Sequence, residues 1–256
     1  SFLATDDIEK SIDLLDEFSN VEDSDELPWK AEWNLLVHLR KHNHLEIASE
    51  RTRLLLNNKE KLVPRDLTVR LLWLDASLAM QMNKPEEALT KSERVIDFLT
   101  GAKGFSLDLD NKVRAQVLLT KGRAFLSSGQ ENKAAEIFTE LQLTYPRSDE
   151  SAFSYLVEAY HHASGNRLDE AQRNLLRLAD GFKKSRYAPR ALYEAALHLE
   201  RRGMDENLKE GVDLLERLIQ GYPDDELVFY ARLRQANLLR RRNEFGSALE
   251  LCEQLL

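Results

Sequence analysis

The sequence predicts an all-α protein built as an α-solenoid, a stack of antiparallel helix hairpins. Three observations predict it. Residues 113–146 show apolar residues at helical spacing on both sides of the turn 127–130, and Pro146 ends the second run. A small residue of this hairpin recurs along the sequence, and Gly and Pro are few and lie at breaks. One hairpin cannot bury its apolar faces alone, so repetition implies stacking.

The repeat is followed through the small residue of each second helix. Its successive positions are Ser11, Ala48, Ala88, Ala134, Ala171, Gly211 and Ala248. The spacings run from 37 to 46 residues, which describes six to seven expanded and degenerate units. Because each unit packs only on its neighbours, we expect one continuous solenoid over residues 1–256.

The turns between paired helices contain residues that end helices. They lie at 42–44, 82–85, 128–130, 165–167, 202–203 and 242–243, and each contains Gly or Asn. Both residue types accept the left-handed conformation that closes a helix. Pro85, Pro28 and Pro64 stand at helix starts, where a missing N–H costs little, and Asp149 or Ser151 is expected to cap the helix after Pro146.

Two connections are longer than the rest, at residues 57–61 and 100–104. The second explains the 46-residue spacing, and we expect a hinge or an edge loop at 100–111. Residues 5–18 read as a second helix without its first, and 244–256 as a second helix at the end of the sequence. Neither end has the polar face of a capping unit, so we expect the sequence to be a fragment of a longer protein.

The hairpin at 113–146 resembles a tetratricopeptide repeat. The residues that carry the resemblance are Gly122, Phe125, Ala134, Phe138 and Pro146, in the order small, aromatic, Ala, aromatic, Pro. Leu118 stands where that family often has Trp. The resemblance implies a right-handed superhelix of helix pairs whose first helices line a concave groove.

A narrower resemblance covers about residues 113–256. Two units end in Tyr-Pro, at 145–146 and 222–223, and another boundary reads Ser185-Arg186-Tyr187-Ala188. These segments are similar to the bacterial envelope branch of the family, namely the lipoprotein scaffolds of outer-membrane assembly and the Tol–Pal-associated coordinator. The resemblance implies a bacterial source and a periplasmic or cell-envelope location, although the composition fits the cytoplasm as well.

Charge and hydropathy exclude some partners. The net charge is −8, and residues 1–32 alone carry −9, which argues against nucleic acid at this end. We read the acidic stretch as a solvated surface rather than a dedicated docking patch. No apolar run is long enough to span a bilayer. The single cysteine, Cys252, is expected to pack in the last helix.

No catalytic motif is visible, and we expect neither enzymatic activity nor a cofactor. His38, His42 and His44 come closest to a metal cluster, but histidines near a helix end are common without metal. Trp29, Trp33 and Trp73 offer either a ligand-binding aromatic box or, as we favour, a packed seam.

The candidate binding residues are carried over from the family alignment at Gly122. Ligand-facing positions fall just after the small residue of each first helix, which selects Arg123, Tyr160 and Asn237, with Arg240 and Arg241 one turn on. Arginine-rich segments nearby would suit an acidic peptide or the terminal carboxylate of a partner. The alternative is that these arginines are solvated or pair with Glu200, Glu206 or residues 224–226.

These features predict a non-enzymatic scaffold that binds a protein or peptide partner in its groove. The alternative is a structural or regulatory arm of a larger protein that mediates self-association or senses a ligand. The sequence does not determine the oligomeric state or the identity of the partner.

Overall fold

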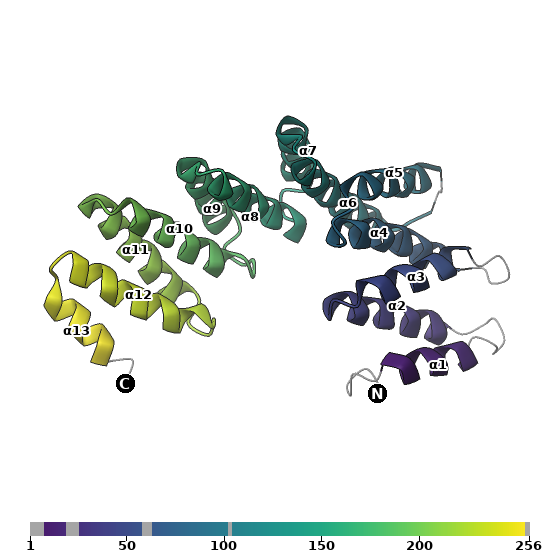
Figure 1. Cartoon of the computed structure of the whole chain (residues 1–256), viewed down its shortest axis with the longest axis horizontal. Helices are drawn as coiled ribbons and strands as arrows, with labels where there is room; N and C mark the ends of the chain where they lie inside the picture. Colours follow the sequence, from purple (N-terminus) through teal and green to yellow (C-terminus); the bar gives the residue numbers. More distant parts are fainter. Residues whose placement is uncertain (1–7, 19–25, 58–62, 102–103, 254–256) are drawn as a thin grey trace. The chain divides into compact units, whose positions relative to one another are not determined.

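The computed structural model describes residues 8–18, 26–57, 63–101 and 104–253, and within these ranges all regular structure is α-helical (Figure 1). The helices are α1 (Ile8–Phe18), α2 (Glu26–Lys41), α3 (Leu45–Asn57), α4 (Arg65–Gln81), α5 (Pro85–Gly101), α6 (Leu107–Ser127), α7 (Glu131–Thr144), α8 (Asp149–Ser164), α9 (Leu168–Gly181), α10 (Ala188–Arg202), α11 (Asp205–Gly221), α12 (Leu227–Arg241) and α13 (Phe245–Glu253). None of these helices is long and apolar enough to cross a membrane. The expected all-α class is confirmed.

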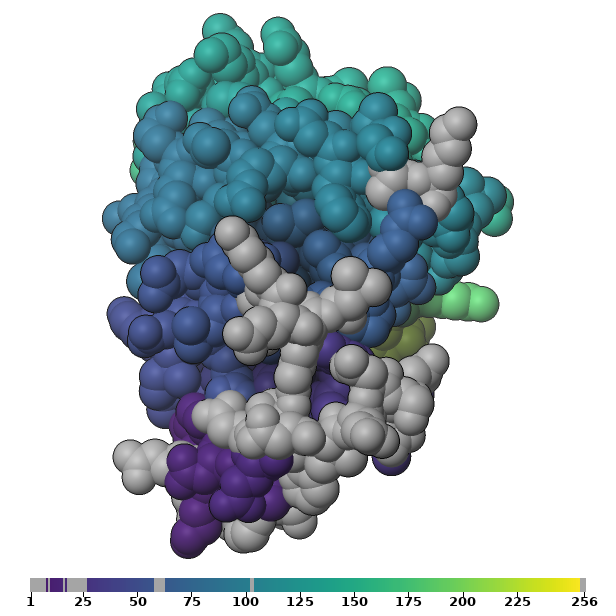
Figure 2. Space-filling view, turned by 90° about the vertical axis from the view of Figure 1, so that its right-hand side faces the viewer, coloured from purple at the N-terminus to yellow at the C-terminus, as the bar shows by residue number. Residues whose placement is uncertain are grey.

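The protein divides into two compact units, residues 1–145 with α1 to α7 and residues 146–256 with α8 to α13. In each unit every helix packs against the next one in sequence, so hairpins such as α4–α5 and α10–α11 stack on their neighbours. Figure 2 shows the first unit, where the helices follow one another as layers from purple α1 to teal α7. The α-solenoid is confirmed.

Residues 104–111 belong to the first unit. The Phe105 ring lies 6.0 Å from the Phe98 ring of α5, and the Ser106 hydroxyl accepts a hydrogen bond from the Leu109 N–H, which caps α6. Helix α6 therefore begins at Leu107, inside the segment that the sequence assigned to a connection. The hinge at 100–111 and the single solenoid over 1–256 stay predictions.

The small residue of each second helix lies in the packed interior between helices. All seven positions are buried, from Ser11 to Ala248. The tightest contact in the matching position of a first helix is at Gly122, where an added Cβ would overlap the Phe138 ring and lie 2.7 Å from its Cδ1 and Cζ atoms. Phe138 is fully buried, so the ring of α7 occupies the space that a side chain on α6 would need.

The turns follow the sequence expectation. Positive φ angles of 58–73° occur at Asn43, Asn83, Gly129, Asn166, Gly203 and Asn243. Asparagine tolerates this region better than most residues, because its short polar side chain forms local hydrogen bonds. In the turn at 165–167 it is Asn166, not Gly165, that adopts it.

Two sequence expectations are wrong. The cap of α8 is Ser148, whose hydroxyl accepts from the Ser151 N–H, whereas we expected Asp149 or Ser151. Cys252 is exposed rather than packed. Pro85 is the first residue of α5 and Pro64 the N-cap of α4, as expected, and Pro28 lies in the first turn of α2.

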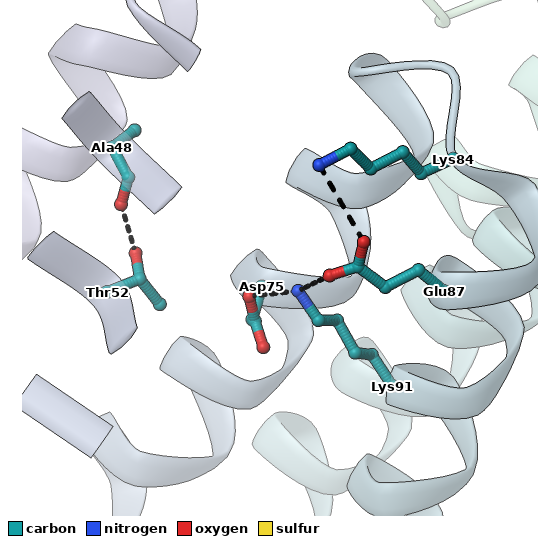
Figure 3. Close-up of polar contacts among 6 residues, drawn as sticks. All are labelled: Ala48, Thr52, Asp75, Lys84, Glu87 and Lys91. Atoms are coloured by element: carbon teal, nitrogen blue, oxygen red, sulfur yellow. Dashed lines mark hydrogen bonds and ion pairs between the residues drawn. The ribbon is translucent and has the colours of Figure 1, made fainter. Parts of the chain in front are cut away.

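A charged cluster joins α4 to α5 (Figure 3). The Lys91 ammonium lies 2.7 Å from Asp75 Oδ1 and 2.6 Å from Glu87 Oε1, and Lys84 approaches Glu87 at 3.9 Å. Burial alone would lower the pKa of Lys91, but the hydrogen bonds to Asp75 and Glu87 outweigh it, so this pKa is raised. The Lys91 hydrogen bond lowers the pKa of Glu87.

A second ion pair joins α2 to α3. Arg51 donates two hydrogen bonds to the Glu32 carboxylate, of 2.6 and 2.8 Å.

We predict that Gly122→Ala destabilises the first unit by about 2 kcal/mol, because overpacking outweighs the gain in helix propensity. The control is Gly181→Ala at the end of α9, where an added Cβ meets nothing within 4 Å and stability should change little. Urea unfolding followed by circular dichroism measures both. Equal stability of Gly122→Ala and the wild type would contradict the packing argument, and Phe138→Leu should partly rescue the variant.

We predict that Asp75→Asn lowers the free energy of unfolding by about 2 kcal/mol, between the values for exposed and buried ion pairs. Because the pKa of Lys91 is raised in the folded state, the stabilisation is present at neutral pH and is lost as the pH rises through that raised value. The difference between variant and wild type should therefore shrink above about pH 10.5. Glu50→Gln, which removes a solvent-exposed pair with Arg53, is the control and should have almost no effect.

Candidate functional site

The first helices of the second unit, α8, α10 and α12, are joined by side chains at their boundaries. The Phe153 ring of α8 lies 5.0 Å from the ring of Tyr187, the residue that precedes α10. The hydroxyl of Tyr222, the residue that follows α11, donates to the Lys183 carbonyl at 2.8 Å. Tyr187 and Tyr222 lie at boundaries that the sequence marks with Tyr, and each contacts the preceding hairpin or the segment that follows it.

The seam between α8 and α10 carries Tyr160. Arg190 Nε of α10 donates to the Tyr160 hydroxyl at 2.8 Å, and its Nη2 atom donates to Glu194 Oε1 at 3.3 Å. Burial is the main cause that raises the pKa of Tyr160, so the hydroxyl stays protonated and neutral. Tyr160 thus contacts the next first helix, although part of the residue is exposed.

The seam between α10 and α12 carries a cluster of charges. The Glu200 carboxylate of α10 lies 3.2 Å from Arg234 Nη1 and 3.3 Å from Arg241 Nη1, both of α12. Its side chain is only 14% exposed. These residues surround a pocket of about 350 Å³, which we call the arginine pocket; it is lined by Leu197, Glu200, Arg201, Arg234 and Arg241. Three guanidinium groups face one carboxylate there, so the pocket has a surplus of positive charge.

A larger pocket of about 650 Å³ lies between α12 and α13. Its lining is mostly apolar and includes Leu233, Phe245 and Leu249. Asn237 and Arg240 lie at its polar side, where Arg240 Nη2 donates to Asn237 Oδ1 at 3.1 Å. This pocket therefore combines an apolar floor with a guanidinium group.

The structure brings together only part of the predicted site. Asn237 and Arg240 share the pocket between α12 and α13, and Arg241 lines the arginine pocket. Tyr160 lines neither of these pockets. Arg123 lies on α6 in the other unit, where burial lowers the pKa of its guanidinium.

The sequence pattern did not point to Leu197 as a site residue. It pointed to Glu200 only as an ion-pair partner for the arginines. A shift of 40 residues aligns α10 with α12, with Ala196 on Ala236, and places Leu197 on Asn237 and Glu200 on Arg240. The pairing alternative is confirmed for Glu200, which binds Arg234 and Arg241. Arg242 instead pairs with Asp205 and Glu244, and Arg202 with Asp169.

The other candidate clusters are explained by packing. The rings of His38 and His42 stack at 4.2 Å, and the described residues contain no group of three His, Cys, Asp or Glu placed to hold a metal ion. Trp29, Trp33 and Trp73 pack against the apolar cluster of α2, α3 and α4, as favoured from the sequence.

Residues 116–148 match the tetratricopeptide repeat family. The protein as a whole resembles solved helical-repeat structures at low identity, which shows the fold alone. The structure of BtubC (BKLC) from P. vanneervenii has a TM-score of 0.55 at 11% identity, and the match covers 84% of this sequence and 88% of that protein. A Rap protein complexed with Competence and Sporulation Factor has a TM-score of 0.60 at 13% identity, with coverage of 95% and 78%. No curated protein matches the sequence significantly.

One buried titratable group lies next to the arginine pocket. His198 of α10 is 5% exposed, and its Nδ1 atom has no hydrogen-bond partner among the described residues. Burial is the main cause that lowers the pKa of His198, and the positive charge of Arg201 lowers it further. One unit later the same position is Leu238, which is fully buried.

We predict that His198→Leu stabilises the second unit, and more so in acid. Because the pKa of folded His198 is lowered, the unfolded state binds more protons below its ordinary value of about 6.5, and stability falls as the pH drops. Leucine does not titrate, so the variant does not lose stability in acid in this way. The increase in the free energy of unfolding at about pH 5.5 should therefore exceed the increase at about pH 7.5. Thermal unfolding at both pH values measures it. An equal gain at both would refute the protonation argument, and the reverse change Leu238→His should introduce the same acid sensitivity.

Proposed function

We propose that this protein, whose fold is tetratricopeptide-repeat-like, is a non-enzymatic scaffold that binds an acidic segment of a partner protein in its arginine pocket. The observation that carries the proposal is the arrangement of Arg201, Arg234 and Arg241 around the single carboxylate of Glu200. Guanidinium groups bind carboxylates through charge-assisted hydrogen bonds, which are stronger than neutral ones.

The occupancy of the pocket supports a carboxylate ligand. Glu200 already engages one terminal nitrogen of Arg234 and one of Arg241, which shows that a carboxylate fits between them. Arg201 lines the same pocket and forms no ion pair with any described residue. An incoming Asp, Glu or C-terminal carboxylate would therefore find a free guanidinium at Arg201 and unused N–H groups on its neighbours.

The apolar pocket beside α12 supports an extended or helical segment rather than a single anion. Arg234 lines both pockets, so a segment that places its acidic group at Arg201 would continue toward Leu233 and Tyr193. A related fold also serves as a binding surface, since the Rap structure was solved with Competence and Sporulation Factor. We further propose a role in bacterial envelope assembly, for which the Tyr-Pro boundaries are the supporting feature. The alternative is a structural or regulatory arm of a larger protein that mediates self-association or senses a ligand.

We predict that peptides selected from a displayed random library on the protein of residues 1–256 are enriched in Asp and Glu beside an apolar residue. Arg201→Glu and Arg241→Glu should each weaken their binding at least about tenfold, because a repulsive charge replaces a charge-assisted bond. Binding should also weaken as salt is added. Fluorescence anisotropy with the selected peptides measures both effects.

The matched control is Arg173→Glu, the same charge change at an exposed arginine of α9, a second helix. It should leave the affinity unchanged. If Arg201→Glu and Arg241→Glu bind as the wild type does, or if the selected peptides carry no acidic residue, the assignment of the arginine pocket is wrong.

A further inference from the structure

The three guanidinium groups of the arginine pocket receive few acceptors from the protein itself. All lining residues of the pocket belong to α10 and α12. Each guanidinium carries five N–H donors, yet among the described residues the three groups donate a single hydrogen bond, from Arg241 Nη1 to Glu200 Oε1 at 3.3 Å. Arg234 only forms an ion pair with Glu200, and Arg201 forms neither kind of contact with a described residue. Most of the donors are therefore available to a ligand.

The contacts with Glu200 are long for charged partners. Charge-assisted N–H···O bonds are typically about 2.7–2.9 Å, and Arg51 binds Glu32 in the first unit with bonds of 2.6 and 2.8 Å. Glu200 lies 3.2 Å from Arg234 Nη1 and 3.3 Å from Arg241 Nη1. It therefore holds the two guanidinium groups near each other without engaging either of them closely, and a ligand can supply a stronger acceptor.

Other arginines of the second unit have carboxylate partners of their own. These pairs join one hairpin to the next, and they are Arg202 with Asp169, Arg217 with Asp180 and Arg242 with Asp205. The arginine pocket departs from this pattern, because its three guanidinium groups share one carboxylate. With three positive charges and one negative charge, the lining has a formal charge of +2.

This charge and the number of arginines match a phosphate monoester better than a carboxylate. A carboxylate supplies one negative charge and two oxygens. Phosphoserine or phosphothreonine carries about −1.5 to −2 charges at neutral pH and three acceptor oxygens. Three arginines can each donate to a different phosphate oxygen, whereas the two oxygens of a carboxylate are matched by two guanidinium groups.

We propose that the arginine pocket recognises a phosphorylated serine or threonine in the segment of the partner protein. The pocket is that of the proposed function, on which this inference rests, and the phosphate is the acidic group that it binds. Arg201, Arg234 and Arg241 each donate to one phosphate oxygen, and Glu200 keeps the last two in position. Leu197, the apolar residue of the lining, contacts the carbon atoms of the phosphorylated side chain.

The experiment uses the protein of residues 1–256 and three fluorescein-labelled peptides, Gly-Ala-Leu-X-Leu-Ala-Gly, in which X is phosphoserine, glutamate or serine. Fluorescence anisotropy at about pH 7.5 should show that the phosphoserine peptide binds about tenfold more tightly than the glutamate peptide, and the serine peptide should bind most weakly. Arg201→Gln should reduce this preference to about twofold, because two guanidinium groups remain. Arg173→Gln, at an exposed arginine of α9, is the matched control and should leave the preference unchanged.

The pH dependence supplies a second measurement. The second pKa of a phosphate monoester is about 6, whereas a glutamate carboxyl has a pKa of about 4.3. At about pH 5 the phosphoserine peptide has lost most of its second negative charge and the glutamate peptide is still ionised, so the preference should fall below about threefold. Both peptides are measured on the same protein, so titration of the protein's own groups acts on both.

The outcomes separate this inference from the proposed function. If the glutamate peptide binds as tightly as the phosphoserine peptide and Arg241→Glu weakens both, the phosphate assignment is wrong and the proposed function stands. Binding of both peptides that is indifferent to Arg201→Gln and Arg241→Glu would overturn the two together. A phosphoserine peptide that does not bind would overturn the phosphate assignment alone. Displacement of that peptide by inorganic phosphate at a similar concentration would do the same, because the pocket would then serve a free anion.

Discussion

The structure depends on the close approach of helices at small residues in each hairpin. At Gly122 the Phe138 ring lies against the backbone of α6, so any side chain there would displace it. At Gly211 the neighbour is Leu238 of the next hairpin. Small residues thus hold a hairpin together and join it to the following one, which is why the recurring position of the second helix is restricted to Ala, Gly and Ser.

Local packing of this kind produces a series of small cores rather than a shared interior. In the first unit, the cluster around Leu35, Leu36 and Leu39 is distinct from the one around Val95, Val113 and Val117. The charged residues that are largely buried here form ion pairs, as Asp75 does with Lys91 and Glu32 with Arg51. Because each hairpin packs on its neighbours, no single core of described residues extends through a whole unit.

The contacts between successive first helices involve the same side chains that are candidates for binding a partner. Tyr160 and Glu200 each receive an arginine from the next first helix, at 2.8 Å and at 3.2–3.3 Å. Two of the residues that the family alignment selects as ligand-facing, Tyr160 and Arg241, are therefore also seam residues. In the arginine pocket this arrangement leaves more guanidinium groups than carboxylates, and that surplus is the chemical basis of the proposed peptide site.

The sequence by itself determined the helix pairs, their register and their turns, because spacing of apolar residues, Asn and Gly at turns, and recurring small residues all act within one or two helices. It placed the small residues correctly from Ser11 to Ala248 and anticipated the left-handed turns. Only the tertiary structure decided which side chains meet across hairpins, such as Glu200 with Arg234 and Arg241. It also decided that Arg190 donates to Tyr160 across the seam between α8 and α10. The physical reason is that burial and ion pairing depend on the neighbouring hairpin, which a pattern within one helix does not contain.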